Sequence, residues 1–333
     1  MRANLARRLL EHYVDKSRAL PWRSPPGSPP AEPYRVWLSE VMLQQTTVAA
    51  VAPRFERFIA RWPTVEALAS APDEQVLAEW AGLGYYARAR NLIACAREVA
   101  ASGGFPKDEA DLRKLPGIGD YTAAAIAAIA FGKRAVVADS NVERVTARLH
   151  ALERPAKARL RAAVAVITPE EGAGDFAQAM MDLGATICRP RDPLCGECPL
   201  AEDCAAFASG SPDRFPRAKA KAPRPVRFGT AQWVERNGAI WLVRRPSKGL
   251  LGGMTALPGG DWTNEPPASA GPALGHVRHI FTHFALELSI VSTDDPIGEG
   301  WWQPIDGLGE AGLPTLYRRA AESVLSSRAK LAA

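Results

Sequence analysis

The chain has 333 residues, of which 47% are hydrophobic and 23% charged, and its formal net charge is +5 at pH 7. This length favours two domains, either of which can bury a core, and the composition is ordinary for a soluble globular protein. Apolar runs are too short for a transmembrane helix, and the amphipathic N-terminal stretch carries charges throughout, unlike a signal peptide. We therefore expect a cytoplasmic protein with no membrane partner.

The positive charge is concentrated between positions 211 and 227. This segment holds six basic residues and one acidic residue, so it accounts for the whole net charge. Because the rest of the chain is neutral on balance, global charge indicates a nucleic-acid partner only weakly. Contacts to such a partner would have to come from local patches and backbone amides.

Two helices are predicted near the N-terminus, over residues 2–19 and about 34–48. Glu40 and Gln44 are four residues apart in the second helix and share a face, and Gln45 lies one step round. A lone glutamate on an amphipathic helix is usually solvated. Its position alone therefore gives Glu40 no role.

A glycine-rich turn at residues 81–86 carries Tyr85 and precedes the basic side chains of Arg88 and Arg90. In one interpretation the turn only starts a helix and places a tyrosine in the core. In the other, an aromatic ring wedges into a base stack, as in proteins that kink DNA. The helices around it are predicted at about 51–61, 64–70, 73–80 and 86–101.

The segment 115–145 combines a tight turn, a helix of small residues and a carboxylate. The turn contains Gly117 and Gly119, and a helix is predicted from Tyr121 to Phe131. Glycines allow backbone to approach a ligand closely, and the free N–H groups of a helix start suit a phosphate. A short apolar run then leads to Asp139, which could act on a nucleotide held at the turn. The alternative is an ordinary turn between helices, with Asp139 or the next residue as an N-cap.

Further helices near 141–150, 156–167 and 174–187 make the first 205 residues all-α, and a cysteine cluster closes this part. In a cytosolic protein such a cluster indicates a metal site rather than disulfides. Four thiolates suit zinc or a [4Fe–4S] cluster; the central C-x2-C knuckle allows zinc, but the long outer gaps favour iron–sulfur. The four candidate ligands fall within seventeen positions: Cys188, Cys195, Cys198 and Cys204.

The pattern changes from helices to strands after residues 207–227, which are rich in proline, alanine and basic residues and have no periodicity. Two short β runs flank Asn237-Gly238, a strong hairpin signal. Later strands are predicted at about 276–281 and 284–292, and a final helix at about 314–327. We expect an extended linker followed by an α+β domain.

The segment 115–145 resembles the helix-hairpin-helix plus Gly/Pro…Asp motif of the endonuclease III superfamily of DNA repair glycosylases. Residues 39–46 (SEVMLQQT) are similar to a signature of its adenine glycosylase branch, the MutY family. The resemblance implies a multidomain fold: an all-α helix-hairpin-helix glycosylase domain with a [4Fe–4S] cluster over 1–206, a basic linker over 207–227, and a Nudix-like 8-oxoguanine recognition domain over 228–333.

The resemblance implies hydrolysis of the N-glycosidic bond of adenine mispaired with 8-oxoguanine or guanine in double-stranded DNA, by a monomeric enzyme. Glu40 corresponds to the catalytic acid, and Asp139 to the carboxylate that stabilises or captures an oxocarbenium-like sugar. Tyr121 and Asn141 would position the intermediate. Because bifunctional members have a Schiff-base lysine where this chain has Tyr121, we expect a monofunctional enzyme.

The resemblance also assigns DNA and substrate contacts. The residues that would touch DNA, hold its phosphate, line the adenine pocket or read 8-oxoguanine are Gln44, Gln45, Tyr85, Gly117, Gly119, Arg18, Trp22, Asp182, Thr282 and His283. Two positions depart from the family pattern: Ser140 replaces glycine and Thr282 replaces serine. The Nudix catalytic box is missing after Gly260, where Pro266 and small residues follow, so we interpret the domain as a recognition module.

Three other functions are weighed. A bifunctional enzyme for oxidised pyrimidines is disfavoured by Tyr121, Glu40 and the C-terminal domain. A non-catalytic damage-binding protein would need neither Glu40 nor Asp139, yet both are present. An iron–sulfur electron carrier is disfavoured because the sequence has no partner site for electron transfer.

Overall fold

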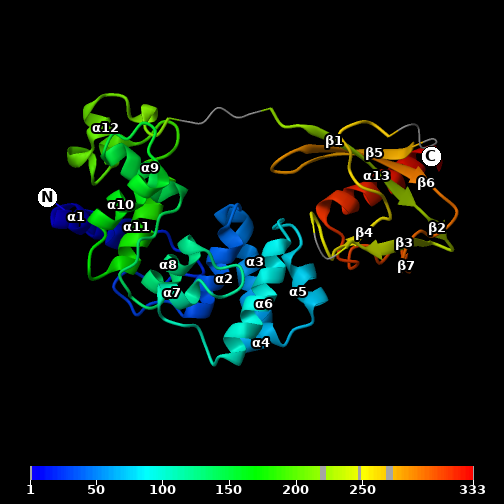
Figure 1. The fold of residues 1–333 in the computed structure, drawn as a ribbon, viewed down its shortest axis with the longest axis horizontal. Coiled ribbons are helices and arrows are strands. Elements are labelled where there is room, and N and C mark those ends of the chain that lie inside the picture. The colour runs from blue at the N-terminus through cyan, green and yellow to red at the C-terminus, as the bar shows by residue number, and fades with distance from the viewer. Residues whose placement is uncertain (1, 218–222, 247–248, 268–272, 333) are drawn as a thin grey trace. The chain divides into compact units, whose positions relative to one another are not determined.

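The computed structural model describes residues 2–217, 223–246, 249–267 and 273–332 (Figure 1). Part of the predicted linker, 218–222, lies outside the described residues. Within the described residues, no helix is long and apolar enough to cross a membrane.

The chain forms two compact units. The first contains Met1–Ser70 and Asn91–Ala220, and the second contains Ala71–Arg90 and Lys221–Ala333. The division near residue 220 lies inside the predicted linker. The grouping of Ala71–Arg90 with the C-terminal part was not indicated by the sequence.

Regular structure in residues 2–217 is helical, as predicted. Helix α6 (Ala87–Ala101) begins in the second unit and ends in the first, and α5 (Asp73–Trp80) belongs to the second. The α-helices of the first unit are α1 (Arg2–Lys16), α2 (Pro33–Leu43), α3 (Val48–Arg61), α4 (Val65–Ala69), α7 (Glu109–Leu112), α8 (Asp120–Ile129), α9 (Ser140–Leu149), α10 (Lys157–Ile167), α11 (Ala173–Thr186) and α12 (Ala205–Ala208).

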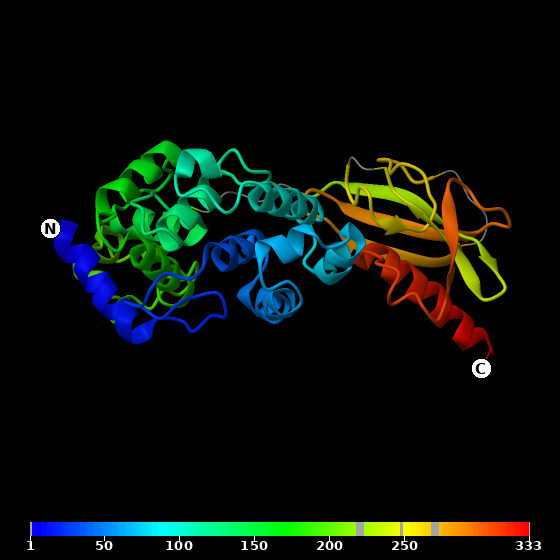
Figure 2. The ribbon, with the colours of Figure 1, turned by 90° about the horizontal axis from the view of Figure 1, so that it is seen from below.

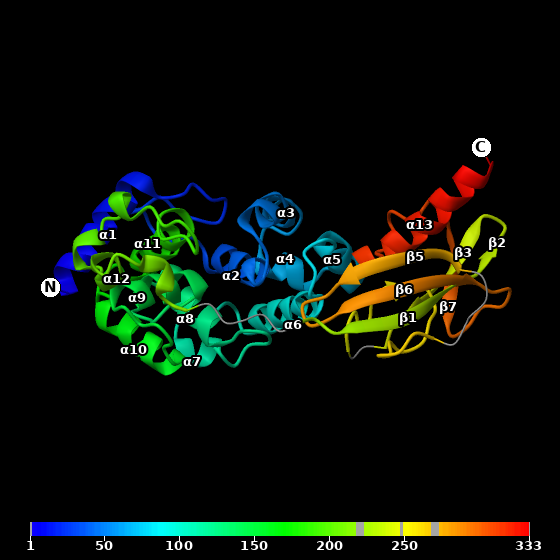
Figure 3. The same ribbon diagram turned by 90° about the horizontal axis from the view of Figure 1, so that it is seen from above.

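Helix α8 is the central helix of the first unit, and its residues from Thr122 to Ile129 are all buried. Small side chains let α11 lie close to it: a Cβ on Gly174 would stand 2.5 Å from the Ala128 carbonyl oxygen. A Cβ on Gly184 would stand 2.6 Å from the Asn141 Cβ on α9. Close packing of α8, α9 and α11 therefore depends on glycine and alanine, and Figures 2 and 3 show these helices with α1 alongside α11.

Helix α2 ends earlier than the sequence indicated. The prediction ran to about residue 48, but α2 ends at Leu43, Gln44 has φ −56° and ψ 114°, and Gln45 has φ 57°. The side chain of Thr47 instead caps α3 by accepting a hydrogen bond from the Ala50 N–H. Gln44 is therefore the C-cap residue of α2, directly after the last residue of the helix, and Gln45 leaves the helical path.

The second unit contains two sheets in its described residues. Strands β1, β6 and β5 form the first, with β1 and β6 parallel and β5 antiparallel to β6; β2, β3 and β4 form the second, with β7 paired to β3 (Figure 3). Helix α13 (Thr315–Ala332) packs on β5. The strands are β1 (Val226–Trp233), β2 (Glu235–Arg236), β3 (Ala239–Arg244), β4 (Thr255–Ala256), β5 (Ala273–Ile280), β6 (Ala285–Ser292) and β7 (Gly300–Pro304).

A hydrophobic core of β-strand and α13 side chains holds the second unit together, with Trp233, Leu286 and Val324 among its buried members. The predicted strands at 276–281 and 284–292 and the final helix are confirmed within a few residues. After β4, residues 257–267 form isolated bridges to β1 instead of a helix. The fold class predicted from the sequence is thus the one observed.

Candidate active site

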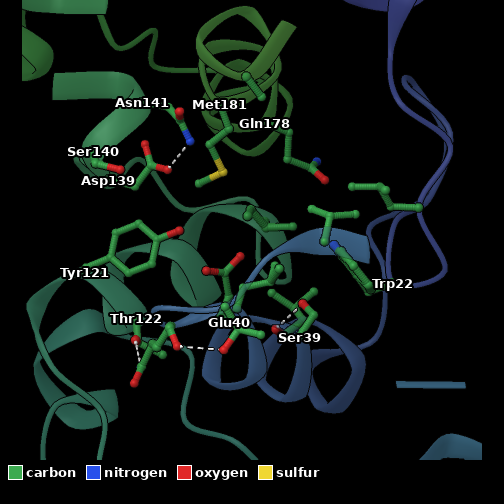
Figure 4. A pocket seen from close by; sticks show the side chains of 18 of the residues that line it. Trp22, Ser39, Glu40, Tyr121, Thr122, Asp139, Ser140, Asn141, Gln178 and Met181 are labelled. Carbon is green, nitrogen blue, oxygen red and sulfur yellow. Dashed lines mark hydrogen bonds between the residues drawn. The ribbon is translucent and has the colours of Figure 1, made fainter. Parts of the chain in front are cut away.

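A cavity of about 950 Å³ opens in the first unit among α2, α8, α9, α11 and the loop after α1 (Figure 4). Most of the residues predicted to act on the base and sugar line it together, although they come from distant parts of the sequence. The predicted residues on its wall are Arg18, Trp22, Glu40, Gln44, Gln45, Gly117, Gly119, Tyr121, Asp139 and Asn141.

Glu40 reaches the cavity from the last turn of α2 but is only 6% exposed. Burial raises the pKa of its carboxyl from 4.5 to about 7, because the charged form loses its hydration. The hydroxyl of Tyr121 and the positive charge of Arg23 lower this pKa, whereas the negative charge of Asp139 raises it. A carboxyl with this pKa can hold a proton near neutral pH and release it there.

Asp139 is both the N-cap of α9 and a wall residue of the cavity. Its Oδ1 accepts a hydrogen bond from the Val142 N–H at 2.7 Å, and its Oδ2 accepts one from Asn141 Nδ2 at 2.8 Å (Figure 4). Two N–H donors suit a carboxylate, which accepts only. Ser140 belongs to the first turn of α9 and has helical backbone, so a serine in place of the family's glycine brings no strain to this turn.

Tyr121 projects from the first turn of α8 toward Glu40 and Asp139 (Figure 4). Burial and these two carboxyl groups raise the pKa of its phenol well above the usual range, so the hydroxyl keeps its proton. This side chain offers a hydroxyl donor to Glu40 and no amine.

A chain of hydrogen bonds leads from Asp139 to the first cysteine of the cluster loop. Asn141 Oδ1 accepts from Arg144 Nη2 at 2.9 Å, and Arg144 Nε donates to the Cys188 carbonyl oxygen at 2.9 Å. Arg144 Nη2 also donates to the Gly184 carbonyl oxygen on α11 at 2.7 Å. The orientation of Asn141, and through it that of Asp139, is therefore tied to α11 and to the loop after it.

Asp182 is buried on α11 between two arginines and does not line the main cavity. Its oxygens accept from Arg18 Nε at 2.7 Å, from the Arg18 N–H at 3.0 Å and from Arg23 Nη1 at 2.7 Å. Burial alone would raise the pKa of this carboxyl, but the arginines hold it below the usual range. Asp182 thus fixes Arg18 and Arg23 at the cavity wall and faces a second cavity of about 490 Å³ beside His12.

Several wall residues were not predicted. Arg23 is almost fully buried and its charge acts on Glu40, while Ser39, Gln178 and Met181 are among the other residues that line the cavity (Figure 4). The sequence offered a signal for Arg23 only, which follows Trp22 at the end of the first helical segment. The other three are ordinary helix residues whose place depends on packing between helices.

The helix-hairpin-helix turn is formed by α7, the residues from Leu115 to Gly119, and α8. Gly117 has φ 74°, and a Cβ there would stand 2.6 Å from Asn91 Cβ, so both conformation and space require glycine. A Cβ on Gly119 would meet no atom within 4 Å. The glycine at 119 leaves the N-terminus of α8 open, as an approaching phosphate requires.

Three predicted residues lie in the second unit instead of the cavity. Tyr85 is 45% exposed with φ 48°, and Thr282 and His283 are exposed between β5 and β6. The hydroxyl groups of Tyr85 and Thr282 share a hydrogen bond. Tyr85, like Gln45, is a side chain larger than glycine held at positive φ, a conformation that concentrates at functional sites.

The four predicted metal ligands surround one small cavity between α9 and the loop after α11; they are Cys188, Cys195, Cys198 and Cys204. Arg148 Nη1 donates to Cys188 Sγ at 3.4 Å and brings a positive charge to the thiolates. In the described part of the chain, no three His, Cys, Asp or Glu side chains are arranged to hold a single metal ion. Four cysteine sulfurs around one cavity supply the ligand set of a [4Fe–4S] cluster.

Comparison with known proteins identifies both parts of the chain. Residues 38–170 match the HhH-GPD superfamily base excision DNA repair protein family, residues 188–204 the iron-sulfur binding domain of endonuclease III, and residues 230–323 the NUDIX domain. A thermostable thymine-DNA glycosylase of known structure aligns with a TM-score of 0.56 at 27% identity, over 62% of this chain and 97% of its own.

The chain is 34% identical to an adenine DNA glycosylase of Rattus norvegicus, over 86% of this chain and 69% of the relative. It is 41% identical to an adenine DNA glycosylase of Mycolicibacterium smegmatis, over 66% of this chain and 76% of the relative.

A helical fold of this family around a cavity with two carboxyl groups defines the class: the protein is a DNA glycosylase of base excision repair. The similarity to the adenine DNA glycosylase of Rattus norvegicus covers 86% of the chain and so extends beyond the helical part into the NUDIX domain. The chain belongs to the adenine DNA glycosylase family, with a [4Fe–4S] cluster as its cofactor, as the sequence predicted.

Proposed function

We propose that this enzyme removes adenine mispaired with 8-oxoguanine, or with guanine, from double-stranded DNA by hydrolysing the N-glycosidic bond. The observation that carries the proposal is the buried Glu40 carboxyl, with a pKa of about 7, in one cavity with Asp139. Adenine leaves poorly as an anion, so its ring must gain a proton as the bond breaks. An acid that keeps its proton near neutral pH meets that need.

The two carboxyl groups have different tasks because their surroundings differ. Asp139, fixed by the N–H donors of Val142 and Asn141, stabilises the oxocarbenium-like sugar that forms as adenine leaves, or captures it covalently. Glu40, once it has given its proton to the base, takes a proton from the attacking water. The hydroxyl of Tyr121 donates a hydrogen bond to Glu40 and so orients its carboxyl group.

The enzyme is proposed to be monofunctional. A lyase step needs an amine that forms a Schiff base, and Tyr121 supplies none. The two lysines nearest this segment form surface ion pairs: Lys114 Nζ lies 2.7 Å from Asp111, and Lys133 Nζ lies 3.8 Å from Asp108. The expected product is an abasic site in an unbroken strand.

The proposed contacts with DNA are made by exposed groups whose chemistry suits phosphate or bases. The open backbone at Gly119 suits a phosphate, and Gln45 and Tyr85 suit the space that a flipped base vacates, which offsets the few kcal/mol of unstacking. Thr282 and His283 offer a hydroxyl and a ring nitrogen to 8-oxoguanine. The cluster, when bound to its four cysteines, cross-links the loop that carries them and enters no step of the reaction.

For the whole chain, we propose a monomer with a catalytic domain over 1–206, a linker over 207–227 and a recognition domain over 228–333. The net positive charge of the sequence lies in the linker. The residues that line the cavity around Glu40 and Asp139 all precede residue 206.

The test is a single-turnover assay on a duplex with adenine opposite 8-oxoguanine and a label on the adenine strand. Strand breakage only after hot alkali is expected, and breakage without alkali, or abundant borohydride-trapped adduct, contradicts the monofunctional mechanism. E40Q and D139N should remove excision while binding is kept. E66Q, at an exposed glutamate of α4, is the matched control and should excise like the wild type.

A further inference from the structure

The loop between β5 and β6, residues 281–284, has a buried base and an exposed tip; it is called the reading loop below. The Phe281 N–H donates to the Phe284 carbonyl oxygen at 2.9 Å, which closes the loop at its base. Phe284 is 7% exposed, whereas Thr282 and His283 at the tip are exposed. The side chains that would meet a base are therefore carried on a platform of aromatic rings.

Trp262 contacts both ends of the reading loop. Its ring stacks on Phe281 with centroids 5.4 Å apart and planes 27° apart, and it lies 6.0 Å from the Phe284 ring at 59°. The two phenylalanine rings are themselves 5.0 Å apart. Trp262 comes from the segment after β4, so it joins the loop to a part of the chain that is distant in sequence.

The position of Trp262 is fixed from the side of β1. Phe228 and Thr263 exchange backbone hydrogen bonds of 2.8 and 2.9 Å, which hold the segment that carries the indole. Gly229 leaves the space that the ring needs, since a Cβ there would stand 2.5 Å from Trp262 Cδ1. A larger residue at position 229 of β1 would therefore displace the Trp262 ring.

A cation holds the same ring from another direction. The Arg245 guanidinium lies 5.1 Å from the Trp262 ring centroid, and Arg245 Nη1 donates to the Tyr317 hydroxyl at 2.9 Å. The indole is therefore held by the backbone hydrogen bonds between Phe228 and Thr263, by the space at Gly229, and by Arg245, which Tyr317 of α13 orients.

We propose that Trp262 is the positioning residue for lesion recognition, because its ring sets the orientation of Thr282 and His283. This inference rests on the proposed function, in which those two residues read 8-oxoguanine. A hydrogen bond distinguishes two bases only when donor and acceptor are held within narrow limits of distance and angle. Trp262 supplies that restraint and touches no DNA itself.

The experiment compares single-turnover excision of adenine opposite 8-oxoguanine with excision opposite guanine. Each rate is measured with enzyme in excess over DNA, at a subsaturating and at a saturating enzyme concentration. In W262A, the ratio of excision opposite 8-oxoguanine to excision opposite guanine at subsaturating enzyme is expected to fall roughly three- to tenfold. This factor corresponds to the free energy of one lost aromatic pair. Excision opposite guanine and the rate at saturation should stay unchanged. W262F should restore the preference, and G229A should mimic W262A by displacing the indole.

The matched control is W302A. Trp302 forms an edge-to-face pair with Trp241, with centroids 5.3 Å apart, in the other sheet of the same unit, and its loss should leave the preference unchanged. Unchanged preference in both W262A and G229A, or an equal loss on both substrates, would overturn the inference. If W262A does not fold, F281L removes the stacking partner while keeping an apolar side chain, and the same readout decides. A wild-type enzyme that excises adenine without any preference would instead overturn the proposed reading of 8-oxoguanine by Thr282 and His283, on which the inference rests, and a wild-type enzyme that excises no adenine would overturn the proposed function as a whole.

Discussion

Replacing Glu40 with glutamine is expected to stabilise the protein at alkaline pH while it removes excision. Glu40 is 6% exposed, and burial raises its pKa from 4.5 to about 7. Since one pKa unit corresponds to about 1.4 kcal/mol, the charged form of Glu40 costs the folded state about 3 kcal/mol. Glutamine has nearly the same shape and can accept the hydrogen bond of Tyr121, but it carries no charge.

The sign of the effect follows from which state holds the proton more tightly. The folded protein has the raised pKa, so below pH 4.5 both states are protonated and wild type and E40Q should be equally stable. As pH rises from 4.5 to about 7, the unfolded chain loses its proton first, and the wild-type free energy of unfolding falls. Above pH 7 the difference should stay constant at about 3 kcal/mol in favour of E40Q.

The assay is anaerobic urea unfolding followed by far-ultraviolet circular dichroism, which reports on the helices of the catalytic domain, near pH 5 and near pH 8.5. E66Q, which removes an exposed carboxyl on α4, serves as the control and should show no such pH dependence. A single-turnover measurement on the same samples should show that E40Q no longer excises adenine.

Two results would refute this reasoning. If E40Q and the wild type differ by the same amount at both pH values, Glu40 does not titrate between them and burial does not set its pKa. If E40Q is the less stable protein near pH 8.5, the charged carboxylate is stabilised in the cavity, and Glu40 cannot be the acid that protonates adenine.

Three further changes test the arrangement around the cavity. Arg148→Gln should lower the iron content per chain, because Arg148 donates to Cys188 Sγ at 3.4 Å and to the carbonyl oxygens of Arg189 and Phe215. Arg144→Gln should slow single-turnover excision about tenfold without weakening binding, because it frees Asn141 Oδ1. Gly119→Ala should weaken affinity for undamaged duplex without lowering the thermal midpoint, because the added methyl group points into open space.

Controls separate these effects from general damage. Arg214→Gln removes an exposed arginine that pairs with Glu153, so iron loss there as well would show that Arg148 is not special. Gly117→Ala should destabilise the fold because of its φ of 74° and the contact with Asn91, unlike Gly119→Ala. If the Arg144→Gln variant also binds duplex DNA more weakly, the substitution has disrupted the whole cavity and has not only freed the Asn141 side chain.

Local signals in the sequence predicted much of the site. The turn before α8, the N-cap position of Asp139 and the cysteine spacing each depend on a few neighbouring residues. The burial of Glu40 could not be predicted, because the polar and apolar residues around it on α2 allow an exposed or an enclosed carboxyl. The packing of α8 and α11 decides between them.

The end of α2 shows why helix boundaries were missed. Helical periodicity continues through Gln44 and Gln45, but Thr47 competes as a cap for α3 and the chain turns between the two helices. Arg23 and Arg148 were missed for a related reason. Their partners lie far along the chain, so no window of sequence contains both members of the interaction.

The capping bond of α9 gives the enzyme a built-in spectroscopic reporter. The Val142 N–H donates a hydrogen bond to Asp139 Oδ1. The chemical shift of this amide proton and its exchange with solvent therefore depend on the charge and position of that oxygen. A bound sugar analogue or a covalent adduct on Asp139 would each change this one resonance. The resonance of one backbone amide could therefore follow the reacting group through the catalytic cycle without any label on the DNA.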